Sequence, residues 1–243
     1  MVQSCSGRRA CVKPNLSQVK AFILDLDGTL YRQEPVRRLM AWRLLCAHLW
    51  RPLEGLRTLR MLCAYRRAQE TLRWDRVSSD PLAQQIRIVA QRCKAQESEV
   101  NSCVTYWSNR AMDLLTQAIR PGLLEFLQLA QEKGMLLAVL SDYPAEAKLA
   151  ALGLRDYFDV VVSANDPEVQ CFKPEPRGLE VVVRRLGVQK HEALYIGDRP
   201  TVDGGAAISA GIPCAILAFN RKTRQPWWEI SGFEDVSNGL RAE

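Results

Sequence analysis

Two aspartates at the end of an apolar stretch are the most chemically informative residues of this sequence. The segment Phe22-Ile-Leu-Asp-Leu-Asp-Gly-Thr-Leu30 runs from apolar residues directly into Asp25 and Asp27. Such a run is typical of a buried parallel strand, and parallel sheets place their ligands outside the carboxyl ends of the strands. Alternation along the strand predicts that both carboxylates lie on one side and share a ligand, for which Mg²⁺ is well suited. Taken alone, Asp27-Gly28 is equally typical of a turn.

Polar residues with chemical potential also follow three later apolar segments. Ser141 and Asp142 come directly after Leu140, a loop after Ser163 reaches Lys173, and Gly197-Asp198 after Ile196 leads on to Asp203. Each has an ordinary structural explanation, because serine caps helices, lysine is usually solvated, and aspartate is favoured in the first turn of a helix. Gathered at one edge of a sheet, the same residues would supply carboxylates, a hydroxyl and an ammonium group to one crevice.

The elements that must position these residues alternate between short strands and helices. We expect strands at 21–24, 135–140, 159–163, 193–196 and 213–218, and helices from about Leu123, Ala145, Pro176 and Val202. This alternation predicts an α/β fold with a Rossmann-like parallel sheet. Residues 34–119 instead show helical spacing throughout, including helices at 81–93 and 97–119, and they follow the first strand. The expected organisation is therefore an N-terminal tail (1–19), a core (20–33 and 119–243) and an inserted all-helical cap (34–118).

Composition narrows the classes of protein that this chain can belong to. Its 243 residues are 47% hydrophobic, which is enough for one large core with a smaller appended unit. No apolar run approaches the roughly 18 residues that a membrane-spanning helix needs. Arg8 and Arg9 are not followed by an apolar stretch, so we expect no secretory signal and a cytoplasmic location. Eight scattered cysteines favour reduced thiols over a disulfide framework or a zinc site.

The net charge of +6 is concentrated in one part of the predicted cap. Between Glu34 and Arg73 there are nine arginines and three glutamates, so that 9 − 3 gives the whole excess. Leucines and tryptophans recur between them at helical spacing, which predicts two amphipathic helices broken near Pro52. The arginines would ordinarily form the solvated face, but they could also bind an anionic group of a substrate. A third possibility is docking on an anionic membrane or an acidic partner, whereas nucleic-acid binding is disfavoured because no reading motif is present.

Taken together, the motifs resemble those of the haloacid dehalogenase-like hydrolase superfamily. The resemblance covers residues 20–32 and 120–218, and its four motifs are Asp-Leu-Asp-Gly-Thr-Leu, Leu-Ser-Asp, Lys-Pro-Glu-Pro and Gly-Asp-Arg-Pro-Thr-Val-Asp-Gly. It implies that Asp25 is the nucleophile and Asp27 the general acid and base. Ser141 and Lys173 would complete the catalytic set. The implied phosphate-binding residues are Ser141, Lys173, Leu26, Asp27 and Asp142, and the implied Mg²⁺ ligands are Asp25, Asp27, Asp198 and Asp203.

The chemistry agrees with these roles. A carboxylate can attack phosphorus and form an aspartyl phosphate, and a second carboxyl can protonate the leaving alcohol and then activate water. The second aspartate of the motif favours phosphate esters over halides, because a halide leaves without a proton. We therefore expect a Mg²⁺-dependent phosphatase acting on a small phosphorylated metabolite, with a phosphomutase as the alternative. One departure is Asp142, where the family often has asparagine, so only its backbone amide is expected to contact phosphate. The inserted helices resemble the superfamily's first class of cap, which closes over small substrates.

Overall fold

A parallel sheet of six strands forms the centre of the computed structural model, which describes residues 13–75, 80–217 and 226–242. The strands are β1 (Ala21–Asp25), β2 (Leu136–Ser141), β3 (Val160–Ser163), β4 (Ala193–Gly197), β5 (Cys214–Leu217) and β6 (Trp228–Ile230). Their order across the sheet is β3-β2-β1-β4-β5-β6, and every neighbouring pair is parallel. β1 therefore lies between β2 and β4, and the carboxyl ends of all three strands meet at one edge.

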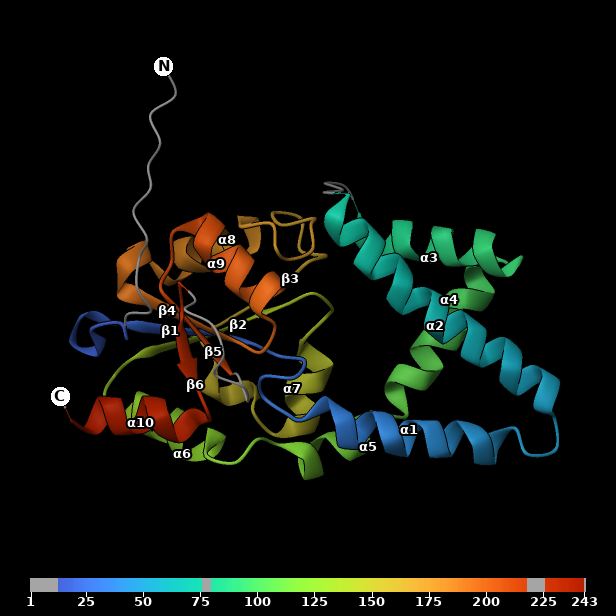
Figure 1. Cartoon of the computed structure of the whole chain (residues 1–243), viewed down its shortest axis with the longest axis horizontal. Coiled ribbons are helices and arrows are strands. Elements are labelled where there is room, and N and C mark those ends of the chain that lie inside the picture. The colour runs from blue at the N-terminus through green and yellow to red at the C-terminus, as the bar shows by residue number, and fades with distance from the viewer. Residues whose placement is uncertain (1–12, 76–79, 218–225, 243) are drawn as a thin grey trace, which may run out of the picture.

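Helices cover both faces of the sheet. α6 (Leu123–Glu132), α7 (Glu146–Leu152) and α10 (Phe233–Arg241) pack on the face that receives Phe22 and Leu24. α8 (Arg177–Leu186) and α9 (Gly205–Ala210) pack on the opposite face, against Ile23 and Ala138. In Figure 1, α6 and α10 lie below the sheet and α8 and α9 lie above it. Because neighbouring residues of a strand point to opposite faces, the uninterrupted apolar strands bury side chains in both layers.

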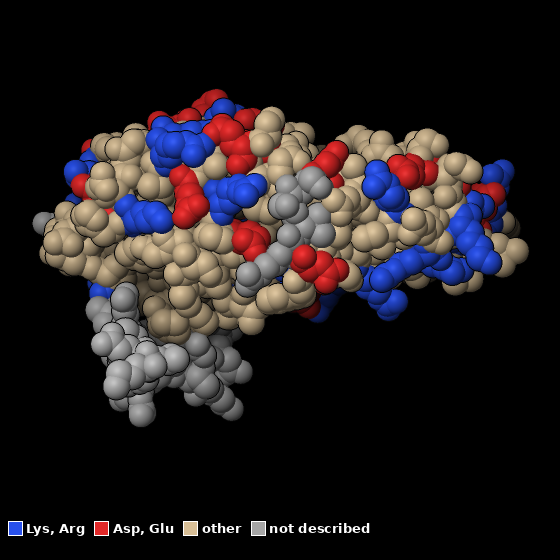
Figure 2. All heavy atoms as spheres, turned by 90° about the horizontal axis from the view of Figure 1, so that it is seen from above, with Lys and Arg blue, Asp and Glu red and all other residues tan. Residues whose placement is uncertain are grey.

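The inserted segment forms a helical cap beside the core. It consists of α1 (Gln33–Ala47), α2 (Pro52–Trp74), α3 (Pro81–Cys93), α4 (Glu97–Asn109) and the short α5 (Met112–Leu115). α2, α3 and α4 share a small apolar core of their own, built around Met61, Ala68, Val89 and Val100. The cap extends to the right of the core in Figure 1, and Figure 2 shows Lys and Arg side chains along that half of the molecule.

The fold class and the five expected strands are confirmed, with three differences of detail. β6 was not predicted, and Trp227 beside it packs in the core against Gly204. The expected helix at 97–119 is broken, because the chain must turn from the cap back to the core where Leu114 and Leu115 are buried. The expected tail is wrong for its last residues, since Leu16 is buried in the core; residues 1–12 lie outside the described part.

Candidate active site

The carboxyl ends of β1 and β2 bring the first two predicted motifs together. Asp25 is paired in register with Leu140, so Ser141 follows one residue beyond it on the neighbouring strand. Both side chains are buried, at 5% and 1% exposure. Thr29 donates a hydrogen bond from its hydroxyl to Oδ2 of Asp25 at 2.9 Å, and the Ser141 hydroxyl accepts one from the backbone amide of Tyr143. The strand ending and the turn after it thus fix the orientation of the Asp25 carboxylate.

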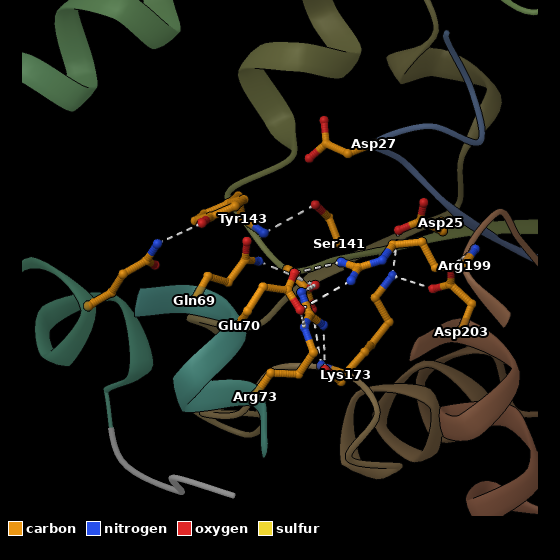
Figure 3. A network of polar contacts seen from close by, with 12 residues as sticks. Asp25, Asp27, Gln69, Glu70, Arg73, Ser141, Tyr143, Lys173, Arg199 and Asp203 are labelled. Atoms are coloured by element: carbon orange, nitrogen blue, oxygen red, sulfur yellow. Dashed lines mark hydrogen bonds and ion pairs between the residues drawn. The ribbon is translucent and has the colours of Figure 1, made fainter. Parts of the chain in front are cut away.

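Lys173 connects this carboxylate to the end of β4. Its ammonium group lies 2.5 Å from Oδ1 of Asp25 and 2.8 Å from Oδ1 of Asp203 (Figure 3). It also donates to the hydroxyl of Tyr195 at 3.1 Å, and that hydroxyl donates in turn to Asp203. Burial alone would lower the pKa of Lys173, but Asp203 and Asp25 raise it well above its usual value. The lysine is therefore held as a cation at the centre of the site.

Three carboxylates surround a position suited to a metal ion. Asp25, Asp198 and Asp203 each offer one oxygen, and these oxygens all lie within 4.8 Å of one another. Oδ1 of Asp198 is buried and has no hydrogen-bond partner, which is a costly state for a carboxylate. Burial and the neighbouring Asp203 raise the pKa of Asp198 to about 6, and burial also raises the pKa of Asp25. Carboxylate oxygens are the ligands that Mg²⁺ prefers, so these residues fit a divalent cation.

Two glycines allow the acidic residues to come this close. Gly28 has a φ of +106°, and a Cβ atom built there would lie 2.1 Å from Oδ2 of Asp198. A Cβ on Gly197 would lie 2.4 Å from Cβ of Asp203. The backbone amides of Asp198 and Arg199 donate to Oδ2 of Asp203 at 3.2 and 2.9 Å, which orients its other oxygen toward Lys173. The glycines of the first and fourth motifs thus have a direct steric role at the site.

The side chain of Asp27 lies outside the group of three carboxylates that could hold a metal ion, which differs from the expectation that it shares a ligand with Asp25. Its carboxylate is bound by Lys148 from α7, at 2.6 Å to both oxygens, and by the hydroxyl of Tyr31. Strand pairing ends at Asp25, so the alternation that would place both carboxylates on one ligand does not extend to Asp27. Figure 3 shows the two carboxylates separated from one another. Of the four predicted metal ligands, the structure groups Asp25, Asp198 and Asp203 and leaves Asp27 for another task.

Asp142 makes the side-chain contacts that link the core to the cap. Its Oδ2 atom lies 2.8 Å from the guanidinium of Arg73, and its Oδ1 atom accepts from the backbone amide of Lys173 at 3.1 Å. Arg73 also donates to the backbone carbonyl of Lys173, and its side chain is completely buried. The expectation that the side chain of Asp142 does not serve phosphate agrees with these contacts, whereas a purely solvated role for the cap arginines is wrong for Arg73.

A second ion pair closes the cap on the core. Glu70 of α2 binds Arg199 through two parallel contacts of 3.0 and 3.1 Å. Nearby, the ring of Tyr65 stacks on Tyr143 with centroids 5.8 Å apart, and Gln85 donates to the hydroxyl of Tyr143. The carboxyl-terminal half of α2 therefore covers the crevice that holds Lys173 and Asp25.

Several residues of the site carry no recognisable signal in the sequence. Lys148 lies on a helix outside every motif. Tyr195 lies inside a strand, where an aromatic residue is ordinarily interpreted as part of the core. Arg73 ends an arginine-rich helix and differs from its neighbours only in being buried. Thr29, by contrast, belongs to the first motif and could have been assigned as a partner of Asp25. Leu26, an expected phosphate-binding residue, has a fully buried side chain and can contribute only its backbone.

Comparisons with known proteins agree with the fold and with the predicted family. The family model described as haloacid dehalogenase-like hydrolase matches residues 19–211. A phosphoglycolate phosphatase from Rhodospirillum rubrum is 30% identical over 224 residues, which cover 85% of this chain and 82% of that protein. A phosphoglycolate phosphatase from Pseudomonas savastanoi pv. phaseolicola is 26% identical over 216 residues, covering 85% of this chain and 72% of that protein.

Solved structures show the same fold at lower sequence identity. A phosphatase of this superfamily from Thermococcus onnurineus has a TM-score of 0.67 and 24% identity, covering 93% of this chain and 99% of that chain. An L-2-haloacid dehalogenase from Xanthobacter autotrophicus has a TM-score of 0.66 and 20% identity, covering 92% and 98%. The fold is a parallel sheet covered by helices on both faces, and the site at its edge is rich in carboxylates. The chain belongs to the haloacid dehalogenase-like hydrolase family, which confirms the predicted family and enzyme class, and its relatives support a phosphatase.

Proposed function

We propose that this enzyme is a Mg²⁺-dependent phosphatase that hydrolyses a small phosphate monoester through an aspartyl phosphate on Asp25. The observation that carries the proposal is the position of Asp25, which is held by Lys173 and Thr29 beside Asp198 and Asp203. This arrangement combines an oriented nucleophile with a fixed cation and a group of carboxylates suited to a metal. Asp25, Lys173 and Asp203 are all buried, which strengthens the electrostatic interactions among them.

The chain's own residues account for both chemical steps. A carboxylate oxygen of Asp25 attacks phosphorus, the bond from phosphorus to the ester oxygen breaks, and the leaving alcohol takes a proton from Asp27. Asp27 then accepts a proton from the water that attacks the aspartyl phosphate, which releases inorganic phosphate and restores Asp25. Lys173 and the hydroxyl of Ser141 stabilise the negative charge on the transferring group.

Asp25, Asp198 and Asp203 would hold the Mg²⁺ ion. When bound, this cation offsets the repulsion among the three carboxylates and the charge of the transferred phosphoryl group. The buried and unpartnered oxygen of Asp198 supports this assignment, because a carboxylate so placed requires a cation or a donor. The site lies at the edge of the sheet beside α2, whose Glu70 and Arg73 contact Arg199 and Asp142 of the core.

Two arginines of the cap support the proposal that the substrate carries a second anionic group. Arg37 of α1 interacts electrostatically with Asp27 and Asp198 of the core and is repelled by Arg66 of α2. Partial burial and the repulsion from Arg66 lower the pKa of Arg37. Two neighbouring guanidinium groups of this kind would suit a carboxylate. Phosphoglycolate, the substrate in the names of the relatives, carries such a group and is the first compound to test. We expect the enzyme to act in the cytoplasm.

Phosphate release from a panel of phosphorylated metabolites tests the proposal. We expect turnover that requires Mg²⁺, is abolished by chelation, and is lost in Asp25→Asn while the circular dichroism spectrum is unchanged. The control is Asp156→Asn, at an exposed position, and this variant should remain active. Asp159→Asn would not serve, because the carboxylate of Asp159 accepts a hydrogen bond from the backbone amide of Leu137 in β2. Activity in Asp25→Asn would exclude Asp25 as the nucleophile. Isomeric products with little free phosphate would identify a phosphomutase.

A further inference from the structure

The end of the cap farthest from the core exposes an unusual number of large apolar side chains. Twelve large hydrophobic residues are exposed in the described part of the chain, and eight of these lie between residues 39 and 59: Leu39, Trp42, Leu45, Leu49, Trp50, Leu53, Leu56 and Leu59. Exposure is greatest where α1 meets α2, at 70% for Leu49, 91% for Trp50 and 82% for Leu53. This junction, which we call the cap tip (residues 45–56), lies at the right-hand end of Figure 1.

These residues are not the edge of the cap's packed interior. α1 buries Val36 and Leu44 on one side, while Leu39, Trp42, Leu45 and Leu49 recur along a different side that faces solvent. α2 likewise buries Met61, Ala64 and Ala68, whereas Leu53, Leu56 and Leu59 are exposed. Both helices therefore carry large apolar side chains that the rest of the described chain does not cover. The sequence pattern predicted apolar stripes on both helices but did not show which of their residues are buried.

Basic side chains accompany the exposed apolar residues. Arg38 and Arg51 are 78% and 74% exposed and Arg57 is 57% exposed, each in a surface ion pair with a glutamate, a kind of contact that contributes little free energy and can be exchanged. A shallow groove continues the surface along α2, and it is lined by Leu56, Arg57, Leu59, Arg60, Cys63 and Cys93. An adjoining hollow adds Arg67 and Arg92. The segment from Glu34 to Arg73 carries a net charge of +6, from nine arginines and three glutamates.

We propose that the cap tip docks on an anionic lipid bilayer, with Trp50 and Leu53 entering the interface and the surrounding arginines binding lipid head groups. Charge complementarity favours this occupant over a second copy of the chain, because self-association would bring two segments of charge +6 together. A bilayer can also receive a protruding side chain such as that of Trp50 without a pocket of matching shape. Tryptophan and arginine suit this boundary, since one end of each side chain is apolar and the other is polar. Docking here is peripheral: no helix in the described residues is long and apolar enough to cross a bilayer.

Vesicle co-sedimentation of the full chain tests the proposal. Vesicles of phosphatidylcholine with phosphatidylglycerol should bind the protein, vesicles of phosphatidylcholine alone should bind it weakly, and added salt should release it. The double variant Trp50→Ser with Leu53→Ser should reduce binding by about tenfold or more. Both side chains are exposed, so the fold and the hydrolysis of a water-soluble substrate should not change. Ile208→Ser, at a residue of α9 that is 51% exposed, is the matched control and should bind like the parent.

Three outcomes would overturn the inference. The first is no binding to anionic vesicles, and the second is equal loss of binding in Ile208→Ser. The third is a dimer in sedimentation equilibrium that the double variant dissociates, without vesicle binding, which would make the cap tip an interface between two copies. None of these results depends on phosphatase activity, so the docking proposal and the proposed function are tested separately.

Discussion

The ammonium group of Lys148 lies 2.6 Å from each carboxylate oxygen of Asp27, so the proposed general acid and base is already paired with a cation. Burial alone would raise the pKa of Asp27. Lys148 opposes this through its charge and its hydrogen bonds, Tyr31 adds a further hydrogen bond, and together they hold the pKa below its usual range. Lys148 is thus a positioning residue that also sets the proton affinity of Asp27.

Removing this cation should move the pH profile of the enzyme. In Lys148→Met burial remains and the opposing charge is gone, so the pKa of Asp27 rises. Asp27 must carry a proton to donate it to the leaving alcohol, so the decline of kcat/KM on the alkaline side should begin at higher pH. Lys148→Arg retains the charge and should leave the profile close to that of the parent. A profile unchanged in Lys148→Met would mean that Asp27 is not the group whose titration limits the reaction.

Binding of Mg²⁺ should stabilise the protein independently of any turnover. A ligand that binds only the folded state at about one hundred times its dissociation constant adds roughly 2.7 kcal/mol. We expect the unfolding temperature of the parent to rise with added MgCl₂ and that of Asp198→Asn to rise much less. Without metal the variant should be at least as stable as the parent, because a carboxyl whose pKa is raised to about 6 in the folded state opposes folding at neutral pH. Asp156→Asn, at an exposed position, should respond to MgCl₂ like the parent; an equal response in Asp198→Asn would remove this residue from the metal site.

Much of the fold was predictable because its determinants are local. Apolar runs such as 135–140 mark buried strands, and the polar residues directly after them mark the edge of the sheet where ligands bind. Asp25, Ser141, Lys173 and Asp198 could therefore be assigned to one crevice before any coordinates. The meeting of Asp25, Ser141 and Asp198 depends on strand direction and on the position of β1 between β2 and β4, and Lys173 reaches them through the loop that follows β3.

The remainder depends on contacts between segments far apart in the chain. Lys148 reaches Asp27 across 121 residues, and Arg73 reaches Asp142 across 69 residues. No local pattern distinguishes these cations from the solvated lysines and arginines around them. The exposed apolar side of α1 is equally invisible to periodicity, since a stripe of leucines has the same spacing whether it faces the core or the solvent.

Gly28 offers a test of how closely the first motif must approach the fourth. Gly28→Ala introduces both an unfavourable φ of +106° and a Cβ atom 2.1 Å from Oδ2 of Asp198. Gly134→Ala introduces a smaller backbone cost, because φ +68° lies in the left-handed region that other residues can adopt, and no atom lies within 4 Å of the new Cβ. We expect about 1 kcal/mol of destabilisation for Gly134→Ala and distinctly more for Gly28→Ala, because only the latter displaces Asp198. The free energy of unfolding from urea titration measures the difference, and Gly28→Ala should also lose its response to MgCl₂. Equal destabilisation with an intact metal response would show that the turn can move aside.

The two ion pairs between cap and core should differ in strength because they differ in burial. Arg73 is completely buried and holds both Asp142 and the backbone carbonyl of Lys173, so Arg73→Met leaves a mostly buried carboxylate without its cation. Loss of one partner of such a pair costs about 3 kcal/mol or more. Arg199 and Glu70 are each 43% exposed, and Arg199→Gln should cost less than about 1 kcal/mol. Since Arg73 also contacts the loop that carries Lys173, the kcat of Arg73→Met should be well below the kcat of Arg199→Gln. Equal losses of stability in the two variants would show that burial does not make the Arg73 contact the stronger one. Equal kcat values would show that the core alone positions Lys173.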